Sequence, residues 1–328
     1  MVWSGNIWRT PVTLLTGFLG AGKTTLLNRI LQGQHKSRFV VLVNDFGSLN
    51  IDRMLIKSEG SNVMTLEGGC VCCLLKNDLV NSILKILSLR PDRILIESSG
   101  VANPYTLLQN LKRPVLSKVV SLESIISLVD ITSLHQICQA GKINYQDLLI
   151  DQISAADIVV INKMDLADET EKATAHQLLR KIAPWARLLE ASYADVSVDL
   201  LLGFSDSFPT RSTSSNLERD HSAQFQTWSY QSDLPFNLHK LRKQLSELPA
   251  GVFRAKGILF TVDRPEERVI VQQVGPRITL EIGETWGEEP RFSQLVLIGV
   301  GGSLDTGMLQ HYFDSCLMSG SDDISPLY

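Results

Sequence analysis

The 328-residue sequence lacks several features that would assign its class at once. It has no apolar run near the roughly 18 residues that a membrane-spanning helix needs. It has no basic block, and no signal-peptide pattern precedes its first apolar segment. With a formal net charge of −4, these absences argue against a membrane partner, a nucleic-acid partner and export.

Histidine and cysteine are also scarce. The six histidines are scattered, which argues against a metal-storing histidine tract. Three of the five cysteines fall within four positions, whereas Cys138 and Cys316 stand alone and are expected to be core or surface thiols. Clustered unpaired thiols need a reducing compartment, so a cytoplasmic location is expected.

The chain is rich enough in apolar residues, at 44%, to form globular cores, and its length suggests two domains. Short apolar segments alternate with helical patterns in the first two thirds of the sequence. Such alternation is typical of a mainly parallel sheet covered on both faces. The expected strands are Val12–Leu15, Phe39–Val43, Val63–Leu66, Arg93–Ile96, Ser124–Val129 and Ile158–Ile161.

A polar stretch without apolar periodicity covers residues 204–224 and is interpreted as an interdomain linker. It separates an α/β domain over residues 1–203 from a smaller α+β domain over residues 225–316. The last residues, 317–328, are polar and are expected to be disordered.

A phosphate-binding loop is predicted between Gly17 and Thr25, where the sequence is Gly-Phe-Leu-Gly-Ala-Gly-Lys-Thr-Thr. It joins a predicted strand to a predicted helix, so backbone N–H groups and a positive helix end point to one place. Lys23 would reach the β- and γ-phosphates and Thr24 would bind Mg²⁺. The loop residues expected at the nucleotide are Gly17, Gly20, Ala21, Gly22, Lys23, Thr24 and Thr25. The alternative is a chance match in an ordinary turn.

The identity of the base is predicted from Asn162, Lys163 and Asp165, which form an NKxD pattern directly after the strand at Ile158–Ile161. A carboxylate at Asp165 accepts from two N–H donors of guanine that adenine does not offer together. Ligands of open α/β sheets gather at the carboxyl ends of strands, so the pattern favours GTP over a mere polar turn.

A third segment, Glu97-Ser98-Ser99-Gly100, follows the strand at Arg93–Ile96. Glu97 would hold Mg²⁺ directly or through water, and the Gly100 N–H would meet the γ-phosphate. Gly100 would then act as a hinge that responds to the γ-phosphate. The alternative is a turn that starts a helix.

The cysteines Cys70, Cys72 and Cys73 follow two glycines in Glu67-Gly68-Gly69-Cys70-Val71-Cys72-Cys73. Thiolates at this spacing can bind one soft or borderline ion, such as Zn²⁺, and three ligands leave a coordination position open. An open site suits a metal that is passed on. Buried core cysteines and a redox pair are the alternatives.

Together, the loop at 16–27, the Gly-Gly-Cys-Val-Cys-Cys motif, Glu97–Gly100 and Asn162–Asp165 resemble the CobW-type family of P-loop GTPases. The resemblance runs nearly the whole length. It implies a GTPase domain followed by a smaller C-terminal domain, and a role in metal delivery or insertion for zinc, cobalt or iron targets.

The sequence departs from that family around the second strand. Many members carry glutamates that flank an Asn-acid-Phe-Gly motif, whereas this chain has Val43 and Ser48 there, so Asp45 is the only acid. Asp45 would position Mg²⁺ or the attacking water. Glu67 or Asp52 would supply a fourth metal ligand.

The sequence therefore predicts an α/β P-loop NTPase domain and a smaller α+β domain that together act as a GTP-hydrolysing metallochaperone. Its catalytic residues would be Lys23, Glu97 and Asp45, its cofactors GTP, Mg²⁺ and zinc or another transition metal such as Co²⁺, and its partner a client metalloprotein. Two alternatives stay open: a cofactor-insertion GTPase of the cobalamin type or metalloenzyme-activator type, and a regulatory GTPase with a purely structural zinc.

Overall fold

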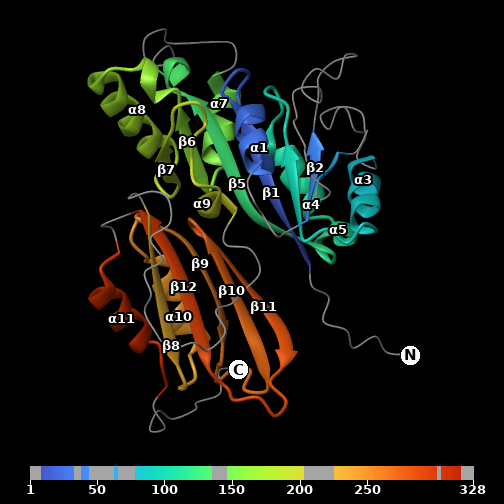
Figure 1. The fold of residues 1–328 in the computed structure, drawn as a ribbon, viewed down its shortest axis with the longest axis vertical. Coiled ribbons are helices and arrows are strands. Elements are labelled where there is room, and N and C mark those ends of the chain that lie inside the picture. The colour runs from blue at the N-terminus through green and yellow to red at the C-terminus, as the bar shows by residue number, and fades with distance from the viewer. Residues whose placement is uncertain are drawn as a thin grey trace. The chain divides into compact units, whose positions relative to one another are not determined.

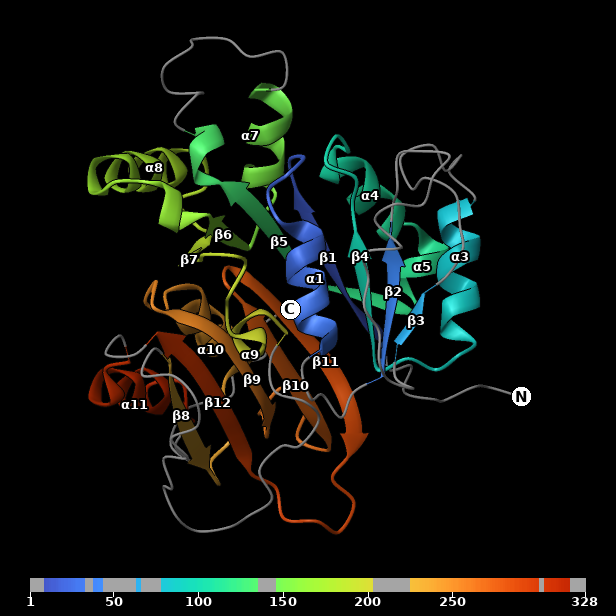
Figure 2. The same cartoon turned by 45° about the horizontal axis from the view of Figure 1, so that its top comes forward.

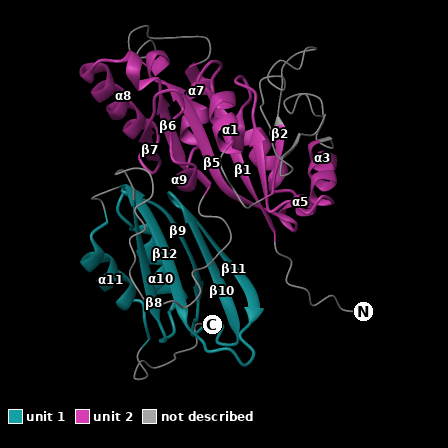
Figure 3. Cartoon of the chain, in the orientation of Figure 1, with its two compact units in different colours: residues 1–6, 207–328 teal, residues 7–206 magenta. Residues whose placement is uncertain are grey.

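A computed structural model describes residues 9–32, 38–43, 63–65, 78–134, 146–202, 225–300 and 304–318. The chain divides into two compact units, one within residues 7–206 and the other made mainly of residues 207–328 (Figure 3). Each unit has its own sheet and its own core. No helix within the described ranges is both long and apolar enough to cross a membrane.

The sheet of the first unit has the order β3-β2-β4-β1-β5-β6-β7 (Figure 1). Every neighbouring pair in it is parallel. The predicted parallel α/β sheet is therefore confirmed. The strands are β1 (Thr10–Gly17), β2 (Phe39–Val43), β3 (Val63–Thr65), β4 (Arg93–Glu97), β5 (Val120–Asp130), β6 (Ile158–Asn162) and β7 (Arg187–Glu190).

Helices cover both faces of this sheet. They are α1 (Lys23–Gln32), α3 (Asp78–Leu87), α4 (Pro104–Leu111), α5 (Pro114–Ser117), α7 (Gln146–Ser154), α8 (Glu169–Ile182) and α9 (Val198–Leu202), with a 3-10 turn η1 (Met164–Leu166). From β1 through β2 to β3 the chain moves toward one end of the strand order. From β3 through β4, β5 and β6 to β7 it moves toward the other end. Right-handed crossovers therefore place α1 on one face and α3 to α8 on the other.

The buried side chains agree with this assignment. Val12 and Leu14 of β1 pack in one cluster with Ile83 of α3 and Leu107 of α4. The alternate position Leu15 is also buried, as are Leu26, Leu27 and Ile30 of α1. Strands buried on both faces need continuous apolar runs, and β1, β2, β4 and β6 have them.

The parallel arrangement brings four strand ends to one edge of the sheet (Figure 2). Leu15 lies opposite Glu97, Gly17 lies opposite Leu128, and Asp130 lies opposite Asn162 in the strand register. The segments that follow β1, β4, β5 and β6 therefore leave the sheet side by side, although they are far apart in sequence.

The second unit contains an antiparallel sheet of order β11-β10-β9-β12-β8. Two helices pack on it and close its core, which confirms the predicted α+β class. Its elements are β8 (Phe225–Ser232), α10 (Leu238–Ser246), β9 (Val252–Leu259), β10 (Glu267–Val274), β11 (Arg277–Thr285), β12 (Ser293–Val300) and α11 (Thr306–Asp314).

Aromatic side chains fill the core of the second unit. Tyr230 packs 5.4 Å from Phe313 and 5.9 Å from Phe236, measured between ring centroids. Leu317 forms a bridge with Phe236, and the Met318 N–H donates to Pro235 O at 2.9 Å. Leu317 and Met318, which follow the expected domain end at 316, therefore contact the second unit.

A capping box starts α8 in the first unit. The Asp168 carboxylate accepts from the Glu171 N–H at 2.8 Å, and the Glu171 carboxylate accepts from the Asp168 N–H at 3.0 Å.

Replacing such a cap by alanine costs about 1 kcal/mol. We expect Asp168→Ala to lower the opening free energy of α8 by that amount, measured by amide hydrogen exchange. Gln177→Ala, at an exposed position of the same helix, is the control and should change it little; equal effects of both variants would contradict the capping role.

Candidate functional site

The loop between β1 and α1 is shaped by glycine. Gly22 has a φ of +105°, and a Cβ there would lie 2.4 Å from the Asn162 Nδ2. A side chain at this position would be strained and would also collide with a buried amide. The Ala21 N–H donates to Phe18 O at 3.3 Å and closes the turn, so the backbone wraps tightly before α1 begins at Lys23.

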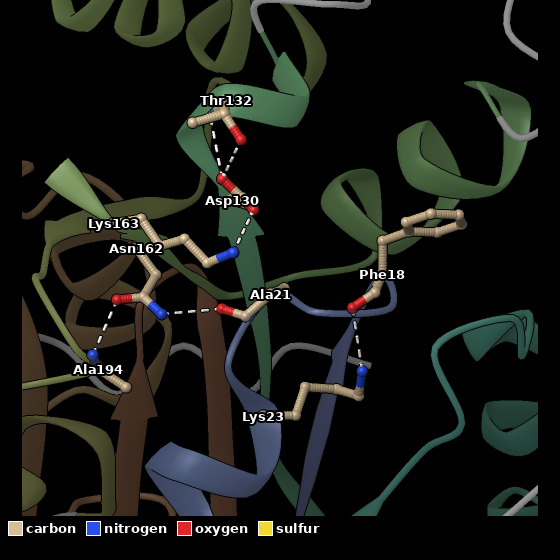
Figure 4. Close-up of polar contacts among 8 residues, drawn as sticks. All are labelled: Phe18, Ala21, Lys23, Asp130, Thr132, Asn162, Lys163 and Ala194. Carbon is tan, nitrogen blue, oxygen red and sulfur yellow. Dashed lines mark hydrogen bonds and ion pairs between the residues drawn. The ribbon is translucent and has the colours of Figure 1, made fainter. Parts of the chain in front are cut away.

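Lys23 lies at the centre of this loop. Its side chain is 8% exposed, and the ammonium donates to Gly17 O at 2.9 Å and to Phe18 O at 3.1 Å (Figure 4). A buried positive charge beside the N-terminus of a helix is an anion-binding arrangement. The predicted position of Lys23 at a phosphate site agrees with this geometry.

Thr24 and Glu97 meet beside the loop. The Thr24 Oγ1 donates to Glu97 Oε1 at 3.1 Å, although the two residues are 73 positions apart. Thr24 is in the first turn of α1, and Glu97, 3% exposed, ends β4. A hydroxyl and a carboxylate placed together fit Mg²⁺, which prefers oxygen ligands. The neighbouring Thr25 is exposed on α1.

Asn162 joins three segments of the site (Figure 4). Its Nδ2 donates to Ala21 O at 2.8 Å, and its Oδ1 accepts from the Ala194 N–H at 2.8 Å. The side chain is 3% exposed, so both bonds are shielded from water. Asn162 therefore fixes the phosphate-loop backbone to the end of β6 and to the segment that follows β7.

Lys163 is held by a second polar contact. Its backbone is in the left-handed region with φ of 63°, and its ammonium donates to Asp130 Oδ2 at 2.6 Å. The other carboxylate oxygen of Asp130 accepts from the Thr132 N–H at 2.9 Å and from its hydroxyl at 2.7 Å. Asp130 therefore aligns the lysine at the end of β6.

Asp165 lies in η1, two residues after Lys163, and its side chain is exposed. An exposed carboxylate beside the ends of β5 and β6 is available to a ligand with paired N–H donors. The structure thus brings Asn162 and Lys163 into one cluster with the phosphate loop and places Asp165 directly after them.

Gly100 lies against the phosphate loop. A Cβ on Gly100 would be 2.7 Å from the Leu19 N, so the two backbones touch. The loop that contains it starts from β4, where the Ser98 N–H donates to Leu15 O at 2.8 Å and extends the sheet pairing.

Four predicted site residues lie outside the described residues: Asp45, Cys70, Cys72 and Cys73. The same holds for Asp52 and Glu67. Across the ranges that the structure describes, no group of three His, Cys, Asp or Glu residues could hold a metal ion.

The sequence interpretation missed several residues that organise the site. Asp130 could have been found, because an acidic residue directly after a buried strand is a common ligand or anchor position. The Ala194 N–H carries no such sequence signal. Arg29 of α1 donates to Tyr193 O at 3.0 Å and to Asp195 Oδ1 at 2.9 Å, which ties α1 to the same segment.

Both units of the chain match known protein families. The family described as "CobW/HypB/UreG, nucleotide-binding domain" matches residues 11–190, and "Cobalamin synthesis protein cobW C-terminal domain" matches residues 225–317. The chain is similar to Zinc chaperone YjiA of Escherichia coli (strain K12), at 30% identity over 88% of this chain and 93% of that protein. It is also similar to Zinc chaperone CobW of Sinorhizobium sp, at 28% identity over 90% and 94%.

A eukaryotic relative shows a comparable likeness. The Zinc-regulated GTPase metalloprotein activator 1 of Dictyostelium discoideum is 26% identical over 96% of this chain and 81% of its own length. The likeness to these relatives therefore includes both units of the structure.

Asn162→Ala would remove both hydrogen bonds that join the phosphate loop to its neighbours. Leaving two buried main-chain groups without partners costs about 2–4 kcal/mol in unfolding free energy. We expect a loss of this size in urea unfolding, together with weaker nucleotide binding. Asn110→Ala is the control, because the Asn110 amide donates to a main-chain carbonyl near the surface; equal losses in both variants would contradict the linking role.

Proposed function

Because the chain belongs to the CobW/HypB/UreG nucleotide-binding family and carries a CobW C-terminal domain, we propose that it is a GTP-hydrolysing metallochaperone. It binds a transition metal, zinc, at Cys70, Cys72 and Cys73 and couples GTP turnover to delivery of that metal to a client metalloprotein. The observation that carries the GTPase assignment is the cluster at the ends of β1, β4, β5 and β6, in which Lys23 donates to Gly17 O and Thr24 donates to Glu97.

Guanine recognition in this proposal depends on Asp165. Its exposed carboxylate accepts from the base, while Asn162 and Lys163 are already fixed by Ala21 O and by Asp130. Because these contacts form within the protein, the binding edge is organised before the base arrives. Preorganised sites lose less entropy on binding.

Hydrolysis is phosphoryl transfer to water, in which the protein positions groups and stabilises charge. Lys23 neutralises charge on the β- and γ-phosphates, and the backbone N–H groups of the phosphate loop bind their oxygens. Thr24 and Glu97 hold Mg²⁺, which when bound neutralises charge that develops on the phosphate oxygens. Asp45 is proposed to position the attacking water, and the Gly100 N–H binds the γ-phosphate.

The metal is the cargo of the proposed reaction. Three thiolates leave one coordination position open, which allows transfer to a client ligand. Zinc is favoured over Co²⁺ because the relatives of this chain are named as zinc chaperones. The proposed location is the cytoplasm, because clustered thiols that bind a metal need a reducing compartment.

Lys23→Ala tests the phosphate loop. Loss of the buried ammonium removes charge stabilisation from the transition state, and we expect GTP hydrolysis to fall by about a hundredfold or more. Steady-state release of phosphate is the measurement. Lys172→Ala, which removes a partly exposed lysine on α8 that pairs with Glu169, serves as the control and should retain the parent rate. Equal rates for Lys23→Ala and the parent would refute the assignment.

Metal delivery is tested by the Zn²⁺ affinity of the reduced protein, measured by chelator competition with Mg²⁺ and either GDP or a non-hydrolysable GTP analogue. Coupling of the two sites requires the Zn²⁺ affinities in the two nucleotide states to differ, and we expect a difference of tenfold or more, roughly 1.4 kcal/mol.

Cys72→Ser should weaken Zn²⁺ binding, whereas Cys316→Ala, in the core of the second unit, should not. Equal Zn²⁺ affinities in both nucleotide states would favour a structural metal.

A further inference from the structure

Gln152 occupies a position of α7 that packing alone would give to an apolar residue. It lies between Leu149 and Ile153 on the buried stripe of the helix, and its side chain is 0% exposed. Both of these neighbours belong to the apolar cluster between α7, α8 and the sheet. A buried amide at this place is unfavourable unless its polar atoms have partners.

The amide of Gln152 binds the loop that follows β4. Its Nε2 donates to Gly100 O at 3.1 Å and to Ala102 O at 3.2 Å, which uses both of its N–H groups. The Oε1 is also buried and accepts no hydrogen bond from the residues that the structure describes. A side chain with one satisfied and one unsatisfied end is a poor choice for stability, so the two carbonyls are the contacts that explain it.

The same loop is fixed at its other end to β1 and the phosphate loop. The Ser98 N–H donates to Leu15 O at 2.8 Å, and the Ser98 Oγ donates to Thr16 Oγ1 at 3.0 Å. Gly100 lies so close to Leu19 that a Cβ would come within 2.7 Å of its backbone nitrogen. The loop is thus held between the phosphate loop on one side and Gln152 on the other.

Two further contacts join the loop and the start of α4 to α7, and both are near the surface. The Asn103 Nδ2 donates to Asp151 Oδ2 at 2.7 Å, and the Tyr105 hydroxyl lies 3.0 Å from Ser154 Oγ. Because water competes for these exposed groups, they hold the loop less firmly than the buried Gln152 amide.

We propose that Gln152 is a positioning residue that enables the chain to distinguish GTP from GDP. By holding the Gly100 and Ala102 carbonyls, it keeps the Gly100 backbone against the phosphate loop, where the γ-phosphate binds. Gln152 touches neither the nucleotide nor the reacting atoms and acts through the loop. The inference rests on the proposed function, because it requires guanine nucleotides as ligands.

Two variants of the full-length protein test this role. Gln152→Met keeps a similar volume and removes both hydrogen bonds, whereas Gln152→Glu keeps the shape and sets a carboxylate oxygen against the two carbonyls. The measurements are kcat for GTP and the dissociation constants of GDP and a non-hydrolysable GTP analogue, all with Mg²⁺. In both variants we expect kcat for GTP to fall at least tenfold. The preference for the analogue over GDP, which is the ratio of their dissociation constants, should also fall at least tenfold. The affinity for GDP should stay within threefold of the parent.

The controls separate positioning from stability. Leu149→Ala removes a buried contact of the same helix, so it should lower the unfolding temperature while the nucleotide preference stays at the parent value. Tyr105→Phe removes an exposed contact between the start of α4 and α7 and should also leave the preference unchanged.

Three results would overturn the inference. Unchanged preference in Gln152→Met and Gln152→Glu would do so alone, and an equal loss in Leu149→Ala would show that general destabilisation is the cause. A parent protein that binds the analogue and GDP equally would also overturn it. Failure of the parent to bind any guanine nucleotide would instead refute the proposed function, and the inference with it.

Discussion

The Asn162 side chain is the contact on which the organisation of the site depends. Parallel strands bring segments from distant parts of the sequence to one edge, but strand pairing alone does not fix the loops beyond that edge. Asn162 supplies this constraint, because its amide binds the phosphate loop through Ala21 O and the segment after β7 through the Ala194 N–H. A Cβ on Gly22 would collide with this amide, so the position of Asn162 requires glycine at residue 22.

Four buried polar side chains of the first unit bind loops or the ends of helices and strands. Lys23, Glu97, Asn162 and Gln152 are each at most 8% exposed, and each has its hydrogen bonds to a loop or to the end of an element. Such groups contribute little net stability, since desolvation offsets most of the gain, but they select one conformation of the backbone. The rigid apolar sheet below supplies the stability, and the polar layer above it sets the geometry of the site.

Much of this arrangement could be predicted from the sequence. The strands at Phe39–Val43 and Arg93–Ile96 are strongly apolar, so their positions follow from local pattern. The strand β7 was missed, because Arg187-Leu188-Leu189-Glu190 is short and has charged ends. Gln152 was also missed: its role comes from two carbonyls about 50 residues earlier, and no local pattern reports a contact of that kind.

The sheet order also relates the strand before the cysteine motif to the phosphate loop. The chain leaves β3 at Thr65, shortly before the cysteine motif, and β3 is parallel to the rest of the sheet. It therefore leaves at the edge where the phosphate loop lies. β2 and β4 separate β3 from β1, which puts their ends about 14 Å apart at the usual spacing of strands. In the sheet order the ends of β2 and β4 lie between these two strand ends. The loop that Gln152 holds follows β4 and therefore starts between the strand that precedes the cysteine motif and the strand that precedes the phosphate loop.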